Sequence, residues 1–149
     1  DYVVGGFSAG GHTTAMWGTA HLGFRNYGIP APKMLLLGYP LLTMENMKAG
    51  PVTDYINLGL FGAGHTIDDI RRYAVHLHLD AAYPKVYLVQ SKDDDTVSPK
   101  DSEDFEIALD RAGVPFRMER PDSGGHGFGL GSATPMNGWV ERAIAFLIE

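Results

Sequence analysis

Residues 2–12 read YVVGGFSAGGH, and this segment gives the strongest indication of the fold class. Residues 2–7 are short, β-branched and aromatic, which predicts a strand buried on both faces. Small residues follow and no proline occurs before Pro30, so we expect a helix over residues 9–22. The apolar run at residues 33–37 then predicts a second strand. Strand, helix and strand in this order are typical of a parallel sheet.

The turn between the first strand and the helix carries the motif GxSxG at residues 6–10, with Ser8 at its centre. A serine between a buried strand and a helix is the setting that a nucleophile elbow requires. We expect glycine at Gly6 and Gly10 because a side chain there would collide with the neighbouring strand and helix backbones. The alternative is a glycine-rich turn in which Ser8 only caps the helix.

The rest of the chain repeats the alternation of strands and helices. Residues 86–89 predict a third strand, and residues 115–119, which alternate apolar with charged side chains, predict a fourth strand at an edge. A helix is expected from Ser98-Pro99 to Gly113, and a last helix from Thr134-Pro135 onward. We therefore predict an α/β fold: one domain over residues 1–149, with a parallel sheet of about four strands and flanking helices.

Residues 41–82 interrupt this alternation. Glycines break up the segment, and we expect an irregular excursion with one helix. Thr66 and Asp69 have the spacing of a capping box, and an apolar face follows behind them at Ile67, Ile70, Ala74 and Leu77.

A serine hydroxyl needs a base and an acid to become a good nucleophile, and both residue types follow later strands. Asp93, Asp94 and Asp95 come after the third strand, and His126 comes after the fourth. The order serine, aspartate, histidine is that of α/β-hydrolases. Because the carboxyl ends of parallel strands share one edge, these residues can converge there. The alternative is that Asp93, Asp94 and Asp95 form only a solvated turn, as an isolated run of aspartates usually does.

Three motifs together resemble the carboxylesterase and acetyl-xylan-esterase-like branch of the α/β-hydrolase fold. They are GFSAGGH at residues 6–12, DDTV at residues 94–97 and GHGF at residues 125–128, and the resemblance covers nearly the whole chain. It implies that Asp94, in an Asp-x-x-Val pattern, is the acid and that His126 is the base. It also implies that the backbone N–H of Ala9 is one oxyanion donor.

The resemblance has a second implication, which concerns length. In that family a His-Gly-Gly stretch after an earlier strand supplies the second oxyanion donor, and it would precede Asp1. We therefore expect residues 1–149 to be the C-terminal half of a larger α/β-hydrolase domain, weakly active or inactive alone. The strand at residues 2–7 would have an open edge, so we expect self-association or pairing with the N-terminal half through it.

Composition excludes several other classes. The chain of 149 residues has 12 Lys and Arg against 18 Asp and Glu, a net charge of −6, and no cysteine. Without a basic cluster it does not predict nucleic-acid binding, and no apolar run is long enough for a membrane span. Disulfides are excluded, and neither a P-loop nor a dinucleotide-binding GxGxxG fits. We expect no cofactor, and no compartment follows from the sequence.

The six histidines raise the question of a metal site. His76 and His78 alternate without a nearby acidic third ligand, which is more typical of a surface, so we expect no metal. His12 and His21 are expected on the first helix, where they would pack or cap. His65 lies in the excursion and could line a pocket.

Three functions remain open at this point. The first is a serine esterase that cleaves small acyl esters, acetylated sugars among them, through Ser8, His126 and Asp94. The second is a serine peptidase of the prolyl-oligopeptidase type, which shares the fold; those enzymes favour a bulky aromatic residue after the serine, whereas Ala9 is small. The third is a non-catalytic fragment or binding module without a complete oxyanion hole.

Overall fold

Four parallel strands form the centre of the molecule. The computed structural model describes residues 1–149, and its sheet has the order β1-β2-β3-β4. The strands are β1 (Val3–Phe7), β2 (Met34–Gly38), β3 (Val86–Val89) and β4 (Phe116–Glu119). Every neighbouring pair is parallel, as in Val3 opposite Met34 and Leu35 opposite Val86. This arrangement confirms the predicted α/β fold.

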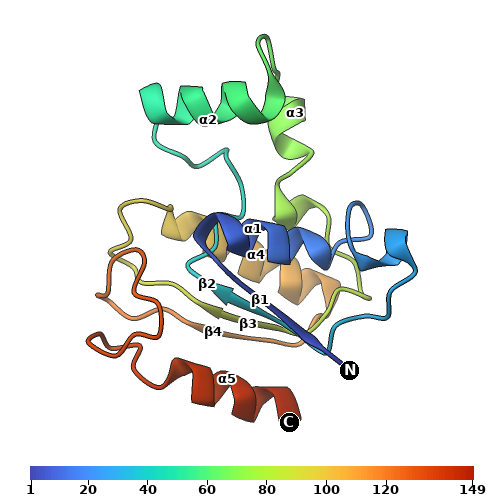
Figure 1. Cartoon of the computed structure of the whole chain (residues 1–149), viewed down its shortest axis with the longest axis vertical. Helices are drawn as coiled ribbons and strands as arrows, with labels where there is room; N and C mark the ends of the chain where they lie inside the picture. The colour runs from blue at the N-terminus through green and yellow to red at the C-terminus, as the bar shows by residue number, and fades with distance from the viewer.

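Helices cover both faces of the sheet and make three layers (Figure 1). Helices α1 (Ser8–Trp17) and α4 (Pro99–Ala112) lie on one face, and α5 (Trp139–Ile148) lies on the other. The first core joins α1 and α4 to the sheet and includes Ala15, Leu35, Leu88, Phe105 and Leu109. The second joins α5 to the sheet and includes Met34, Tyr87, Val89, Trp139 and Phe146.

The two helices after β3 differ in how well their starts were predicted. Helix α4 begins at Pro99 and ends before Gly113, whose φ of 69° is left-handed, as expected. Helix α5 begins at Trp139 rather than at Thr134, so the predicted start is wrong. Thr134 instead closes a turn, donating to the Gly131 carbonyl and accepting from the Met136 N–H.

Strand β1 is more exposed than its sequence predicts. Val3 and Phe7 are 40% and 43% exposed, so the prediction of a strand buried on both faces is wrong. The reason is position: β1 lies at one edge of the sheet, whereas the α5 core is built on β2 and β3. Helix α1 also stops at Trp17, five residues before the expected end, and a short 3-10 helix, η1 (Phe24–Tyr27), follows.

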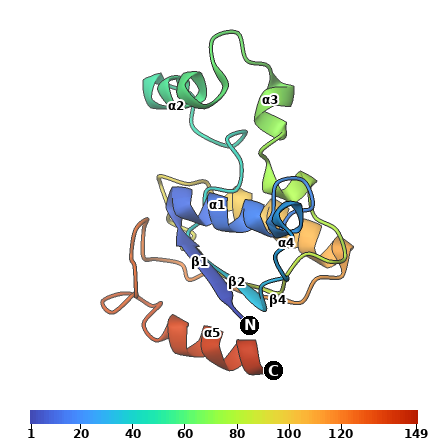
Figure 2. The same cartoon turned by 45° about the vertical axis from the view of Figure 1, so that its right-hand side comes forward.

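The segment between β2 and β3 holds α2 (Pro51–Phe61), α3 (Ile67–Arg71) and the 3-10 helix η2 (Val75–Leu77), so the expectation of a single helix is wrong. Helices α2 and α3 form a cap that stands away from the three layers (Figures 1 and 2), whereas η2 packs against α4. The predicted capping box of Thr66 and Asp69 is confirmed at the start of α3. None of the helices has the length and apolar character needed to cross a bilayer.

Candidate active site

Ser8 occupies the sharp turn between β1 and α1. Its φ is 52°, a left-handed value that side chains rarely adopt, and its carbonyl accepts a hydrogen bond from Leu41 N–H at 3.1 Å. A Cβ on Gly6 would lie 2.2 Å from the Gly10 carbonyl oxygen, so only glycine fits there. Gly10 differs, since a Cβ there meets nothing within 4 Å. The predicted collision therefore holds for Gly6 and is wrong for Gly10.

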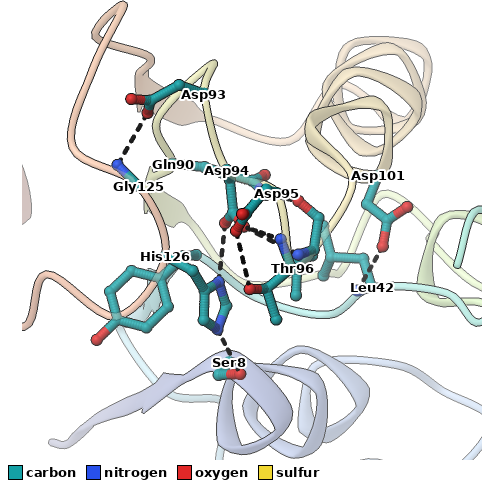
Figure 3. Close-up of polar contacts among 12 residues, drawn as sticks. Ser8, Leu42, Gln90, Asp93, Asp94, Asp95, Thr96, Asp101, Gly125 and His126 are labelled. Carbon is teal, nitrogen blue, oxygen red and sulfur yellow. Dashed lines mark hydrogen bonds and ion pairs between the residues drawn. The ribbon is translucent and has the colours of Figure 1, made fainter. Parts of the chain in front are cut away.

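The side chains of Ser8, His126 and Asp94 form one chain of hydrogen bonds (Figure 3). Oγ of Ser8 lies 2.9 Å from Nε2 of His126, and Nδ1 of His126 lies 2.9 Å from Oδ2 of Asp94. The Asp94 side chain is fully buried and that of His126 is 18% exposed. The structure thus brings together all three residues that the sequence analysis selected, from the carboxyl ends of β1, β3 and β4.

Asp94 is held in place by backbone donors. Its Oδ1 accepts hydrogen bonds from the N–H groups of Thr96 and Val97 at 3.0 and 2.9 Å. This leaves Oδ2 for His126, with Gln90 Nε2 at 3.4 Å as a further donor. A carboxylate fixed at one oxygen presents the other in a defined direction.

The two neighbouring aspartates point elsewhere. Oδ1 of Asp93 accepts a hydrogen bond from Gly125 N–H at 2.8 Å (Figure 3), and Oδ2 accepts one from Gly124 N–H at 3.3 Å. Asp95 accepts from the hydroxyl of Thr96 at 3.2 Å. Asp93 therefore ties the loop that carries His126 to the loop that carries Asp94. This role was not predicted from the sequence, although the sequence has an aspartate next to Asp94 and two glycines before His126.

Tyr39, at the end of β2, is a second contact of the histidine loop that the sequence analysis missed. Its ring meets that of His126 edge-on, with centroids 4.9 Å apart, and its hydroxyl accepts a hydrogen bond from Gly129 N–H at 3.1 Å. The residue is 6% exposed and has a φ of 37°. An unfavourable backbone conformation next to a polar site is typical of functional regions.

Asp101, near the start of α4, is a buried carboxylate outside the chain of three. It is 1% exposed and accepts hydrogen bonds from Asn46 Nδ2 at 2.9 Å and, through Oδ2, from the N–H groups of Leu42 and Thr43. Burial raises the pKa of Asp101 to about 6, against the lowering effect of these donors. The residue fastens the segment that follows Leu41 to α4, and no sequence signal identified it.

The other histidines lie apart from this site. His12 on α1 places Nδ1 2.9 Å from the Leu41 carbonyl oxygen, and burial lowers its pKa. His21 follows α1 instead of lying on it, and its ring stacks on that of His78 at 4.7 Å. His65 places Nδ1 3.0 Å from the Gly62 carbonyl oxygen within the cap. The chain contains no group of three histidine or acidic side chains placed to hold a metal ion.

The whole chain, residues 1–149, matches the family described as the prolyl oligopeptidase family. The chain belongs to the prolyl oligopeptidase family. The comparison with curated protein sequences finds no match. Family membership agrees with the α/β-hydrolase fold that the resemblance in the sequence implied.

Three solved structures resemble this family member. An acetyl ester-xyloside bifunctional hydrolase from Caldicellulosiruptor lactoaceticus is 25% identical, over 96% of this chain and 54% of its own, with a TM-score of 0.79. A sugar hydrolase from Lactococcus lactis is 22% identical, over 97% and 56%, with a TM-score of 0.76. A carboxylesterase from Lactobacillus plantarum is 21% identical, over 97% and 57%, with a TM-score of 0.70. The chain spans about half the length of these structures.

Proposed function

We propose that the protein is a serine hydrolase that cleaves carboxylic esters through Ser8, His126 and Asp94. The observation that carries the proposal is the hydrogen-bonded chain from Ser8 Oγ through His126 to a buried Asp94, with 2.9 Å at both links. The strained φ of 52° at Ser8 adds support, because a nucleophile elbow holds its serine in such a conformation.

The proposed reaction has two halves. In the first, His126 Nε2 takes the proton from Ser8 as Oγ bonds to the ester carbonyl carbon, and the protonated ring then gives that proton to the departing alcohol. In the second, His126 takes a proton from water, the hydroxide oxygen attacks the acyl-enzyme, and the acid leaves as Ser8 is reprotonated. Asp94 stabilises the imidazolium and keeps its Nδ1–H directed at Oδ2, so that Nε2 faces Ser8.

The oxyanion of the tetrahedral intermediate needs N–H donors. The Ala9 N–H lies in the first turn of α1, where N–H groups have no acceptor within the helix, and Phe7 provides no side-chain cap. We assign Ala9 as one donor. A hole with one donor instead of two costs about 10² to 10³ in rate, so we expect slow turnover by residues 1–149 alone.

Two candidate activities, an esterase and a peptidase, differ in the bond that is cleaved. The esterase is favoured by the small Ala9 after the nucleophile and by the names of the similar structures, which include an acetyl ester-xyloside bifunctional hydrolase and a carboxylesterase. On this basis the proposed substrates are esters of small acyl groups, acetylated sugars among them. A serine peptidase is the second candidate, because the family description is that of prolyl oligopeptidases.

Hydrolysis of p-nitrophenyl acetate and of a proline-containing peptide p-nitroanilide tests the proposal. We expect turnover of the ester and its loss in Ser8→Ala, while Ser132→Ala, an exposed serine in the loop before α5, keeps it. Turnover of the peptide alone would identify a peptidase. If neither substrate turns over above the Ser8→Ala background, the chain is a binding module or an inactive part of a larger enzyme.

We propose a macromolecular partner at the open edge of β1. This strand pairs with β2 on one side only, and its residues Val3 and Phe7 are 40% and 43% exposed. Unpaired edges of this kind bind other strands, here a second copy or the part of the fold that the longer structures have in addition. Light scattering is expected to show dimers or larger species, and a stable monomer at high concentration would contradict this.

A further inference from the structure

Helix α2 in the cap presents its side chains in an unusual way. Its buried residues, Thr53 and Asn57, are polar, whereas its large apolar residues are exposed, except for the half-buried Ile56 and Phe61. Tyr55 is 79% exposed, and Leu58 and Leu60 are 54% and 58% exposed. A helix on a globular protein normally buries its apolar stripe. The reversal leaves an apolar surface without a partner next to the site.

This surface borders an apolar groove that reaches the nucleophile elbow. The groove has a volume of about 480 Å³, and its wall on the cap side comes from α2. Ala9, Leu41 and Met44 form the wall opposite α2, and no charged side chain lines the groove. A volume of this size lies within the range of small-molecule sites, which are mostly apolar with few polar groups.

Two residues that line the groove, Ala9 and Leu41, connect it to the proposed nucleophile. Ala9 follows Ser8 directly and carries the proposed oxyanion N–H, and Leu41 donates its own N–H to the Ser8 carbonyl. His126, which must stand beside the departing alcohol to protonate it, does not line the groove. The acyl side of an ester is therefore the part that extends toward α2.

We propose that this groove binds the acyl chain of the substrate and that the enzyme prefers unbranched apolar acyl groups of about four to eight carbons over acetyl. This rests on the proposed ester hydrolysis and extends it beyond acetyl esters. Each methylene group that moves from water to an apolar surface raises the affinity up to about fourfold. The gain per methylene is smaller in an open groove, because part of the acyl chain stays in water. Across six additional methylenes we expect a rise of roughly tenfold or more.

Gly59 offers a variant that fills the groove without disturbing the fold. It lies within α2 and lines the groove, its φ is not in the left-handed region, and a Cβ there meets nothing within 4 Å. Gly59→Phe therefore places a ring in the groove and also raises helix propensity. Ile107→Phe is the matched control, since Ile107 is 50% exposed on α4 and does not line this groove.

The experiment compares p-nitrophenyl acetate, butyrate and octanoate, which share one leaving group. We expect kcat/KM to be about tenfold higher for octanoate than for acetate in the unaltered protein and in Ile107→Phe. In Gly59→Phe this ratio is expected to fall about tenfold. A ratio near one in the unaltered protein, or a ratio that Gly59→Phe leaves unchanged, would overturn the proposal.

A binding measurement keeps the groove testable if turnover is absent. Equilibrium dialysis of the octanoate and acetate esters against Ser8→Ala measures affinity without hydrolysis. About tenfold tighter binding of octanoate, lost in the Ser8→Ala, Gly59→Phe double variant, supports the groove even when the proposed function fails. Equal affinities for the two esters overturn the groove and leave the proposed function standing.

Discussion

The carboxyl ends of the strands, where Ser8, Asp94 and His126 meet, and the cap differ in how their side chains are held. At the carboxyl ends of the strands, Asp94 is buried and forms hydrogen bonds with Val97 and His126. The core residue Leu109 of α4 is also fully buried. In the cap, α2 leaves Tyr55 and Leu58 exposed and packs mainly against α3. This difference agrees with the two proposals made above, in which firmly held side chains carry the chemistry and the loosely packed helix α2 contacts the acyl chain of the substrate.

The largest expected effect on activity comes from substitution of Asp94, the proposed acid. Asp94→Asn removes the charge that stabilises the imidazolium and allows the wrong histidine tautomer, so we expect kcat for p-nitrophenyl acetate to fall about 10³- to 10⁴-fold. Asp95→Asn is the matched control, because Asp95 bonds Thr96 and does not contact His126, and should keep kcat within about twofold. Equal losses in the two variants would contradict the assignment of Asp94.

Leucine-to-alanine substitutions in the core and in the cap are expected to differ in their effect on the free energy of unfolding. Leu109→Ala is expected to lower the free energy of unfolding by about 2 to 5 kcal/mol, because the residue is fully buried in the α4 core. Leu58→Ala should change it by less than about 0.5 kcal/mol, because more than half of that side chain is in water. Urea unfolding followed by circular dichroism checks both values. A large loss in Leu58→Ala would mean that the cap packs as firmly as the core.

The carboxylate of Asp101 predicts a pH dependence of stability. Its pKa is raised from 3.8 to about 6 in the folded protein, so the folded state holds this proton more tightly than the unfolded chain. Protonated Asp101 contributes on the order of 2 to 3 kcal/mol to the free energy of unfolding. This contribution is complete below pH 3.8 and is lost as the pH rises to about 6. Urea unfolding between pH 4 and 7 measures this, and Asp101→Asn should remove that component. An unchanged pH profile in Asp101→Asn would contradict it.

The smallest expected effect concerns the link between the two catalytic loops. Asp93→Ala frees the N–H groups of Gly124 and Gly125 and loosens the approach of His126 to Ser8. Because Asp93 touches no reacting atom, we expect kcat to fall about tenfold with KM unchanged. Asp122→Ala, another exposed aspartate in the same region, bonds Lys92 and should have no such effect. A change in KM alone would show that Asp93 does not act through His126.

The parts of the molecule that the sequence predicted are those that depend on local pattern. The strands β2 and β3, helix α4 and the elbow at Ser8 follow from apolar runs, caps and glycines that are close in the chain. Helix α2 was missed because its inward residues Thr53 and Asn57 are polar, so the usual apolar stripe gave no signal.

Other features depend on contacts between distant segments, which one sequence does not reveal. The resemblance chose Asp94 among three aspartates, but the link from Asp93 to Gly125 appears only when β3 and β4 are side by side. The burial of Asp101 likewise depends on contacts with Leu42, Thr43 and Asn46, which are far from it in the sequence. The position of β1 at the edge of the sheet, which leaves Val3 and Phe7 exposed, was likewise not indicated by the pattern of its residues.

The central claim is that Ser8 is a nucleophile activated by His126 and Asp94, and covalent labelling tests it most directly. A fluorophosphonate is incubated with the protein, and intact-mass and peptide mass spectrometry locate the adduct. We predict one adduct per chain, on Ser8, absent in Ser8→Ala and formed at least about tenfold more slowly in Asp94→Asn. No adduct on the unaltered protein, or the same adduct in Ser8→Ala, would contradict the account.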